Sequence, residues 1–193
     1  MIKQIENFIT NEECNILINW ISENVNQKGK INPSEIFSYR QVDHSLVDNV
    51  YVWSIMEKYR WKVSQYAMKA FDYEMLYPEY TDLVVWYGGD SMGLHADNFD
   101  CGGNKPYVHD LYFRKISCLI YLNDDFEGGE TFFENGNNIK PKKGMLAMFP
   151  SDCTHMHGVT KVINGTRYTM PMWLTDLSDI YLGRIGRYYN IKS

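Results

Sequence analysis

The sequence predicts a mainly β fold with supporting N-terminal helices, and three observations indicate it. The chain has 193 residues, close to the roughly 150 residues of one domain. Its 15 Tyr, 9 Phe and 5 Trp suit pleated, half-buried surfaces. After Pro78 the apolar residues change from helical spacing to short runs of strand length. We therefore expect one domain over residues 1–193, with helical support over about 1–75 and a β-core over about 80–176.

Two helices are expected before the β-core. Thr10 is followed three residues later by Glu13, which is the pattern of a capping box. Apolar residues then recur at i, i+3, i+4 and i+7: Cys14, Leu17, Ile18 and Ile21. These features predict a helix over Asn11–Glu23. A looser helical period predicts a second helix over Leu46–Phe71, either continuous or broken near Trp61.

The β-core is indicated by short apolar or β-branched runs that Gly, Asn and Asp separate. The runs are Leu83–Tyr87, Ile116–Leu122, Thr131–Phe133, Met145–Phe149, Met156–Val162 and Thr166–Leu174. Strands at this spacing without intervening helices predict an antiparallel sandwich or barrel. The stretch from Asn98 to Lys115 has little periodicity, and a loop of that length in a compact domain is usually functional, often a lid.

Charge and cysteine usage exclude several classes of protein. Lys and Arg number 19 against 24 Asp and Glu, a net charge of −5, which disfavours nucleic-acid binding. No apolar run approaches the roughly 18 residues of a membrane span. The lysines Lys140, Lys142 and Lys143 are expected in a solvated turn. Four cysteines form no C-x-x-C pair and follow no secretory signal: Cys14, Cys101, Cys118 and Cys153. This predicts four free thiols in a cytoplasmic protein.

The chemical signal is a set of possible metal ligands followed by an arginine. His95 and Asp97 are two residues apart, so an extended chain presents both side chains on one face. His155 and His157 follow some 60 residues later, and either one can complete a set of two histidines and one carboxylate. That set is the facial triad of non-haem Fe(II) oxygenases. Arg167 lies in an aromatic and apolar run; it either points inward to an anionic partner or lies outward on an edge.

Several blocks in the same order resemble the Fe(II)- and 2-oxoglutarate-dependent dioxygenases, specifically their prolyl 4-hydroxylase branch. The blocks extend over about 90 residues: Trp86-Tyr87-Gly88-Gly89, His95-x-Asp97, Arg114 to Phe126, Glu127-Gly128-Gly129-Glu130-Thr131, Pro141 to Pro150, His157-Gly158-Val159, Gly165-Thr166-Arg167-Tyr168 and Trp173. The resemblance implies a jelly roll, also called a double-stranded β-helix, of cupin-like form.

The resemblance also implies roles for individual residues. His95, Asp97 and His157 would hold Fe(II), because the family pattern H-x-V followed by a basic residue about ten positions later selects His157 over His155. Arg167 would bind the distal carboxylate of 2-oxoglutarate.

Further positions correspond to residues around the cosubstrate or the substrate. Tyr87, Tyr121 and Thr131 match family positions that line the cosubstrate site. Arg114 and Trp173 match positions on the substrate side of the iron. Met92 stands where many prolyl hydroxylases have a tyrosine that contacts the substrate, so the substrate pocket is expected to differ there.

By this resemblance the chain is expected to hydroxylate a prolyl residue in a peptide or protein, using O2 and releasing succinate and CO2. Ascorbate is a further reductant that the resemblance suggests. One alternative is hydroxylation of a free amino acid or small metabolite, because an arginine in the position of Arg167 also occurs in branches that act on other substrates. A nucleic-acid demethylase ranks third on charge. An alternative of another class is a catalytically inactive jelly-roll module for binding or sensing. The sequence assigns no oligomeric state.

Overall fold

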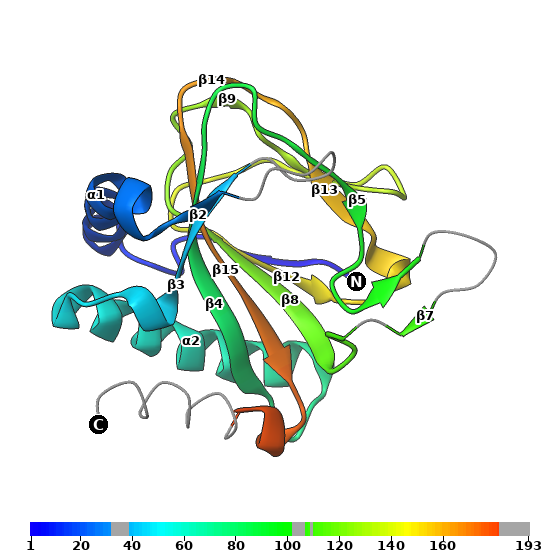
Figure 1. Cartoon of the computed structure of the whole chain (residues 1–193). Coiled ribbons are helices and arrows are strands. Elements are labelled where there is room, and N and C mark those ends of the chain that lie inside the picture. The colour runs from blue at the N-terminus through cyan, green and yellow to red at the C-terminus, as the bar shows by residue number, and fades with distance from the viewer. Residues whose placement is uncertain (32–38, 102–106, 109, 182–193) are drawn as a thin grey trace.

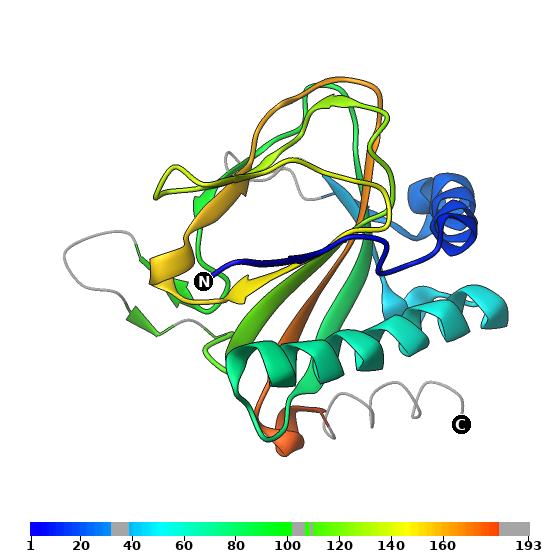
Figure 2. The same ribbon diagram turned by 180° about the vertical axis from the view of Figure 1, so that it is seen from behind.

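Two antiparallel sheets face each other in the computed structural model, and two helices cover the outer side of the larger sheet (Figures 1 and 2). The structure describes residues 1–31, 39–101, 107–108 and 110–181. The N-terminal amino group lies beside His155, near the smaller sheet. This arrangement is the jelly roll with N-terminal helices that the sequence predicts.

The two helices confirm the predicted scaffold, but the first ends later than predicted and the second begins at Val50, four residues after the predicted Leu46. Helix α1 covers Asn11–Lys28, and the Thr10 side chain accepts a hydrogen bond from the backbone N–H of Glu13. This helix ends five residues later than predicted. Helix α2 covers Val50–Phe71 without a break, because its interior contains no Pro or Gly to interrupt the backbone hydrogen bonds. A short 3-10 helix, η1, covers His44–Leu46.

The larger sheet has seven strands, and each neighbouring pair is antiparallel. In spatial order they are β1 (Lys3–Ile5), β12 (Leu146–Pro150), β8 (Arg114–Tyr121), β15 (Arg167–Thr175), β4 (Tyr77–Trp86), β3 (Arg40–Asp43) and β2 (Lys30–Ile31). The three central strands, β8, β15 and β4, carry many of the residues that line the cavity between the two sheets.

The smaller sheet and two strand pairs complete the β-core. The sheet contains β11 (Asn138–Ile139), β10 (Thr131–Phe133), β13 (His157–Val159) and β5 (Met92–His95) in that order. The pairs are β14 (Val162–Asn164) with β9 (Glu127–Gly128), and β6 (Phe99–Asp100) with β7 (Tyr107–Val108). The predicted loop from Asn98 to Lys115 therefore contains β6 and β7, while residues 102–106 and 109 lie outside the described part.

Alternation along the central strands divides the side chains between two layers. One set packs with the helices in the main core: Ile116, Cys118 and Ile120 of β8, Met170, Met172 and Leu174 of β15, and Leu83 and Val85 of β4. The intervening residues face the smaller sheet. Burying each large apolar side chain contributes about 1.5–3 kcal/mol to folding. Burial of these residues against the helices therefore determines which alternate residues face the smaller sheet.

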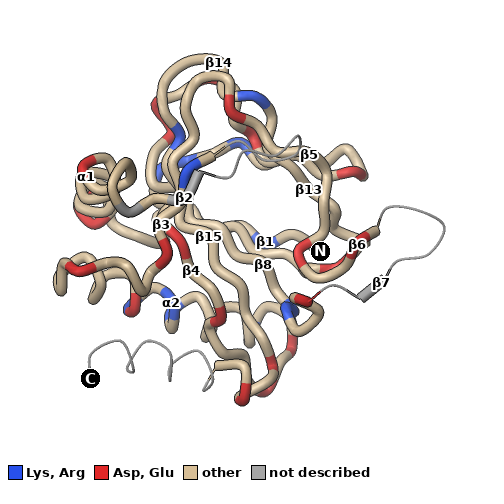
Figure 3. Tube along the Cα trace, viewed as in Figure 1, with Lys and Arg blue, Asp and Glu red and all other residues tan. Residues whose placement is uncertain are grey.

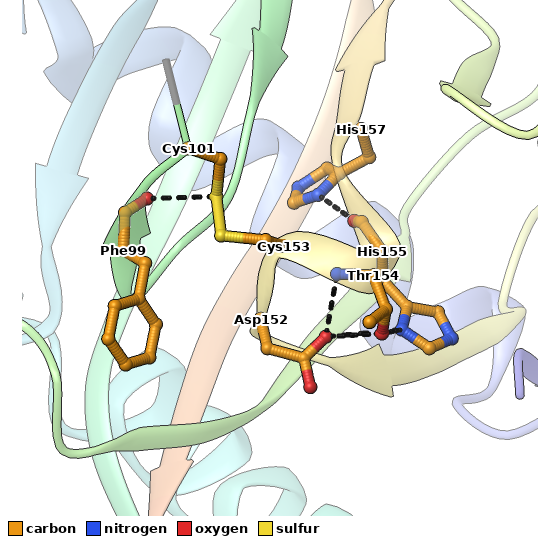
Figure 4. The surroundings of a disulfide bond; sticks show 7 residues. All are labelled: Phe99, Cys101, Asp152, Cys153, Thr154, His155 and His157. Carbon is orange, nitrogen blue, oxygen red and sulfur yellow. Dashed lines mark hydrogen bonds and ion pairs between the residues drawn. A yellow bond between two sulfur atoms is a disulfide. The ribbon is translucent and has the colours of Figure 1, made fainter. Parts of the chain in front are cut away.

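The cysteines correct one prediction. Cys101 and Cys153 form a disulfide across 52 residues of sequence, so the prediction of four free thiols is wrong for this pair. Cys14 and Cys118 are free and buried, as predicted. The error arose because the two partners lie far apart in sequence and approach only when β6 folds against the segment before β13. Figure 4 shows the bond beside His155 and His157.

Charged residues are interspersed along the trace (Figure 3). In the lysine cluster, Lys142 pairs with Glu6 and the Lys143 ammonium donates to the Asn15 side chain at 2.6 Å. These contacts tie the turn before β12 to the N-terminal segment. Within the described residues, no helix combines the length and apolar character that crossing a bilayer requires.

Candidate metal centre and cosubstrate pocket

Three side chains converge at one end of the smaller sheet. His95 and His157 are direct partners in the pairing of β5 with β13, and their ring centroids lie 4.4 Å apart. Asp97 follows β5, with its Oδ1 3.5 Å from His95 Nε2 and its Oδ2 3.6 Å from His157 Nε2. One ligand atom from each residue lies within 4.8 Å of the others. Such separations allow the three to meet one ion.

Backbone contacts orient both imidazoles. His95 Nδ1 lies 3.1 Å from the Gly93 carbonyl, and His157 Nδ1 lies 3.2 Å from the His155 carbonyl (Figure 4). A carbonyl accepts a hydrogen bond, so each Nδ1 carries the proton and donates it. Both Nε2 atoms are left on the side of Asp97. This is the usual way in which a protein fixes the tautomer of a metal-binding histidine.

The electrostatics of Asp97 and His157 favour the forms that bind a metal. At His95, burial would lower the pKa, but the hydrogen bond with Asp97 raises it. Burial alone would raise the pKa of Asp97, but its interactions with the imidazoles of His157 and His95 hold it well below its ordinary value. Burial lowers the pKa of His157 to about 4. Asp97 is therefore ionised and His157 neutral near neutral pH, and these are the states that a metal ligand requires.

His155 lies outside this set. It ends the 3-10 helix η2, which covers Cys153–His155, and its ring points toward the Thr154 hydroxyl (Figure 4). Its Nε2 is 2.7 Å from the Met1 amino group. Among the described residues, the one cluster of three or more possible metal ligands is His95, Asp97 and His157. Two imidazoles and a carboxylate fit Fe(II), with positions left open for other ligands.

Arg167 is buried in the same cavity with incomplete hydrogen bonding. It is 1% exposed at the start of β15, between the rings of Trp86 and Tyr121 at 5.0 and 5.4 Å from their centroids. Its Nη2 donates to Thr131 Oγ1 at 3.5 Å, whereas Nε and Nη1 have no partner among the described residues. Burial lowers the pKa of Arg167 only to about 10, so it stays charged. A buried cation with two open donors fits a bidentate carboxylate.

Thr131 and Tyr121 extend this anion-binding arrangement. The Tyr121 hydroxyl lies 2.7 Å from Thr131 Oγ1, and both residues are buried. Burial raises the pKa of Tyr121, although the nearby Arg167 opposes the shift. The phenol therefore stays protonated, and its hydroxyl can donate. Thr131 lines the cavity, whereas Tyr121 supports it from behind.

Tyr87 does not lie where the resemblance implies. Its ring packs against the helix-facing core, and the Arg40 guanidinium carbon lies 4.7 Å above it. The preceding residue, Trp86, lines the cavity and is the register partner of Arg167. Successive residues of an extended strand point to opposite faces, so Trp86 takes the inward position and Tyr87 cannot.

The residues expected on the substrate side share the cavity, whose volume is about 710 Å³. Met92, Arg114 and Trp173 all line it. The Arg114 guanidinium carbon lies 3.9 Å above the Trp173 ring, and its Nε donates to Glu79 Oε2 at 3.0 Å. This volume falls in the range of small-molecule sites and exceeds what a five-carbon dicarboxylate needs.

Sequence reasoning missed three residues that contact the predicted site. Trp86 covers Arg167, and the buried Ser117 and Ser151 lie behind Asp97. For Ser117 a signal was present, because it is four residues from Tyr121 on one predicted strand and therefore shares its face. For Ser151 no such signal was present, because it follows the end of β12 and strand alternation does not indicate its direction.

The comparisons with known proteins agree with this geometry. Residues 82–175 match the model of the 2OG-Fe(II) oxygenase superfamily. Prolyl 3-hydroxylase 2 of Rattus norvegicus is 38% identical over 95 residues, which cover 44% of this chain and 14% of that protein. The chain thus spans a small part of the length of this relative.

Solved structures share the fold. The viral collagen prolyl hydroxylase of Paramecium Bursaria Chlorella virus-1, in complex with 2OG, aligns with a TM-score of 0.66 and 20% identity over 91% of this chain and 96% of that one. A prolyl hydroxylase from Trichoplax adhaerens, in complex with a peptide fragment of hypoxia inducible factor, aligns with a TM-score of 0.70 and 15% identity over 94% and 86%. Residues 82–175 of this chain are therefore similar to the 2OG-Fe(II) oxygenase superfamily, and part of the chain is similar in sequence to prolyl 3-hydroxylases.

Proposed function

We propose that the chain is an Fe(II)- and 2-oxoglutarate-dependent hydroxylase of a prolyl residue in a peptide or protein. One observation carries the proposal: a His, Asp and His cluster shares a cavity with a buried arginine that has two open donors. A binding module without catalysis has no need for both features together. The relatives named above supply the substrate class, because they are prolyl hydroxylases.

The residues of the chain divide the work of binding. His95, Asp97 and His157 would hold Fe(II), and Arg167 with Thr131 would bind the distal carboxylate of 2-oxoglutarate. When bound together with O2, the metal and cosubstrate supply oxidative decarboxylation to succinate and CO2 and transfer of an oxygen atom to the substrate. The burial of Arg167 excludes water, which strengthens its pairing with a carboxylate.

The charges lining the cavity favour a peptide over a free amino acid. Among the described residues that line the cavity, the lysines and arginines are limited to Arg114 and Arg167. Arg114 is paired with Glu79 and stacked on Trp173. A free amino acid has a carboxylate that needs a cationic partner in the cavity, whereas an internal prolyl residue of a peptide has no free carboxylate. The flat Trp173 face and the apolar Met92 suit a pyrrolidine ring.

The decisive experiment measures turnover of 2-oxoglutarate to succinate by protein loaded anaerobically with Fe(II) and then given O2. A panel of proline-containing peptides and free amino acids is analysed by mass spectrometry for the gain of one oxygen atom, with 2-oxoglutarate present and absent. We expect the gain on a prolyl peptide. Fragmentation of the product distinguishes carbon 3, as the curated relatives' names suggest, from carbon 4. If only free amino acids are modified, the substrate class is a free amino acid or small metabolite and not a prolyl peptide. Absence of both 2-oxoglutarate binding and turnover would favour the inactive module.

A paired substitution tests the ligand set. We expect His157→Ala to abolish binding of Fe(II), because it removes one of three ligands, while His155→Ala leaves binding unchanged. Equilibrium dialysis of the apoprotein against Fe(II) without oxygen measures both variants. If His155→Ala has the larger effect, the assignment of His157 is wrong.

Two finer parts of the proposal depend on the sequence alone. Ascorbate as a reductant remains a prediction, tested by whether it prolongs turnover. The cytoplasmic location also remains a prediction, although the Cys101–Cys153 bond removes the premise that all thiols are free. Disulfides of this kind are more typical of oxidising compartments.

A further inference from the structure

Two buried hydroxyl groups lie behind the Asp97 carboxylate. Ser117, on β8, is 3% exposed, and Ser151, just after β12, is 2% exposed. Ser117 Oγ donates a hydrogen bond to Asp97 Oδ2 at 2.5 Å. Ser151 Oγ lies 2.8 Å from Ser117 Oγ. Buried hydroxyls in a β-core are unfavourable unless they are hydrogen-bonded, and this pair is bonded toward the predicted metal ligand.

The bonds have a fixed direction. A serine hydroxyl carries one proton, and Ser117 uses it on the carboxylate, so Ser151 must be the donor to Ser117. Ser151 also holds the backbone of the same ligand, because its carbonyl accepts the Asp97 N–H at 3.0 Å. The position of Ser151 is fixed in turn by its own N–H, which donates to the Lys115 carbonyl at 3.0 Å. Asp97 is therefore held through both its backbone and its side chain.

We propose that Ser117 and Ser151 are positioning residues that set the orientation of the Asp97 carboxylate toward the metal. The inference rests on the proposed function, since it requires a metal at His95, Asp97 and His157. A charge-assisted hydrogen bond to Oδ2 restricts rotation of the carboxylate plane. Restricting that rotation keeps the carboxylate from taking a second coordination position, which the cosubstrate and O2 need.

The competing explanation is that the pair only supports packing between β8 and β12. The chain offers a matched control in Ser64 of α2, which is 1% exposed and donates from Oγ to the Leu76 carbonyl at 2.5 Å. Ser64→Ala removes an equally buried and bonded hydroxyl away from the cavity. Ser117→Thr keeps the hydroxyl while changing the packing, so it tests for rescue by the conservative variant.

The experiment titrates apoprotein with Co(II) and follows both heat and visible absorption. We expect Ser117→Ala to weaken Co(II) binding roughly 10–100-fold and to change the absorption bands that report cobalt coordination. Ser117→Thr should retain affinity and spectrum close to those of the unmodified chain. Ser64→Ala should unfold more easily while its Co(II) affinity and spectrum stay unchanged.

A double substitution tests the order of the two serines. Because Ser151 acts on the carboxylate through Ser117, the hydroxyl effects are expected to be non-additive. Ser151→Ala should weaken Co(II) binding less than Ser117→Ala, and the double variant should bind no more weakly than Ser117→Ala alone. Additive losses would contradict the proposed order.

The proposal is overturned if Ser117→Ala, folded by circular dichroism, binds Co(II) with unchanged affinity and spectrum. It is also overturned if Ser64→Ala weakens binding equally, since the effect would then be structural. Failure of the proposed function is distinguishable. If Co(II) binding depends on Ser117 but 2-oxoglutarate is not consumed, the hydroxylase proposal fails and the positioning role stands. If the unmodified chain does not bind Co(II), both fail.

Discussion

Removing the Cys101–Cys153 disulfide should destabilise the chain by a calculable amount. The bond joins β6 to η2, and so connects the segment after Asp97 to the segment before His157. In the unfolded chain it closes a loop defined by a sequence separation of 52 residues. The chain-entropy model for a loop of that length gives about 4 kcal/mol at room temperature. The predicted loss applies equally to reduction and to substitution of either cysteine.

Denaturant unfolding, followed by circular dichroism, measures this loss. The free energy of unfolding of the unmodified chain should fall by about 4 kcal/mol on adding a phosphine reductant. Cys101→Ser and Cys153→Ser should each show a similar loss and no further response to reductant. Cys14→Ser is the matched control, because this buried cysteine is free and its substitution should leave the response to reductant intact.

Three outcomes would refute the reasoning. The first is titration of four reactive thiols in the unfolded, unreduced chain, which would show that the bond does not form. The second is a bond that forms but whose reduction leaves the free energy of unfolding unchanged, which would show that loop closure does not govern its contribution. The third is a Cys14→Ser variant whose stability no longer responds to reductant, which would show that the bond involves Cys14 and not the pair Cys101 and Cys153.

Two further predictions concern the helical layer and the cosubstrate pocket. Burial alone would raise the pKa of Glu13, but hydrogen bonds from Lys58 and two hydroxyls lower it to about 2 from 4.5. The contribution of ionised Glu13 to the free energy of unfolding is therefore present above pH 4.5 and is lost as pH falls toward 2. Glu13→Gln should therefore reduce the free energy of unfolding by about 1 kcal/mol at neutral pH and by progressively less in acid, measured by denaturation across that range. Gly129 has φ +61°, and an added Cβ would lie 2.9 Å from Phe126 Cε2 and 3.0 Å from Arg167 Cδ. Gly129→Ala should therefore displace Arg167 and weaken 2-oxoglutarate binding about tenfold, or 1.4 kcal/mol, as measured by calorimetry. Gly136→Ala, at φ +84° with nothing within 4 Å, should leave that affinity unchanged; equal losses in both variants would contradict the contact with Arg167.

Local patterns were sufficient to predict most of the fold. The Thr10 capping box placed the start of α1, and short apolar or β-branched runs placed the central strands, because both signals depend on neighbouring residues. The predicted end of α1 at Glu23 was too early. Val25 is buried in the core and lies four residues after Ile21, so it continues the same apolar period.

The inward or outward direction of site residues was harder to predict. The spacing of His95 and Asp97 is a local signal, and the structure places both side chains in the cavity. The position of Tyr87 could not be predicted without the strand register, because only the pairing of β4 with β15 shows that Trp86 lies opposite Arg167. A family position carried over by sequence can therefore be correct in its block and wrong by one residue, which reverses the face in a strand.

The contacts that hold Asp97 and its flanking segment explain why sequence motifs alone do not describe this site. Its side chain is held by Ser117 of β8, its backbone by Ser151 after β12, and its following segment by the disulfide to Cys153. These partners come from segments that meet only in the folded sheet. A chain can keep His95, Asp97 and His157 and lose these contacts, and we expect it then to bind metal less tightly because the ligands are no longer pre-organised. The metal affinity of this site should therefore depend on residues outside the ligand motif.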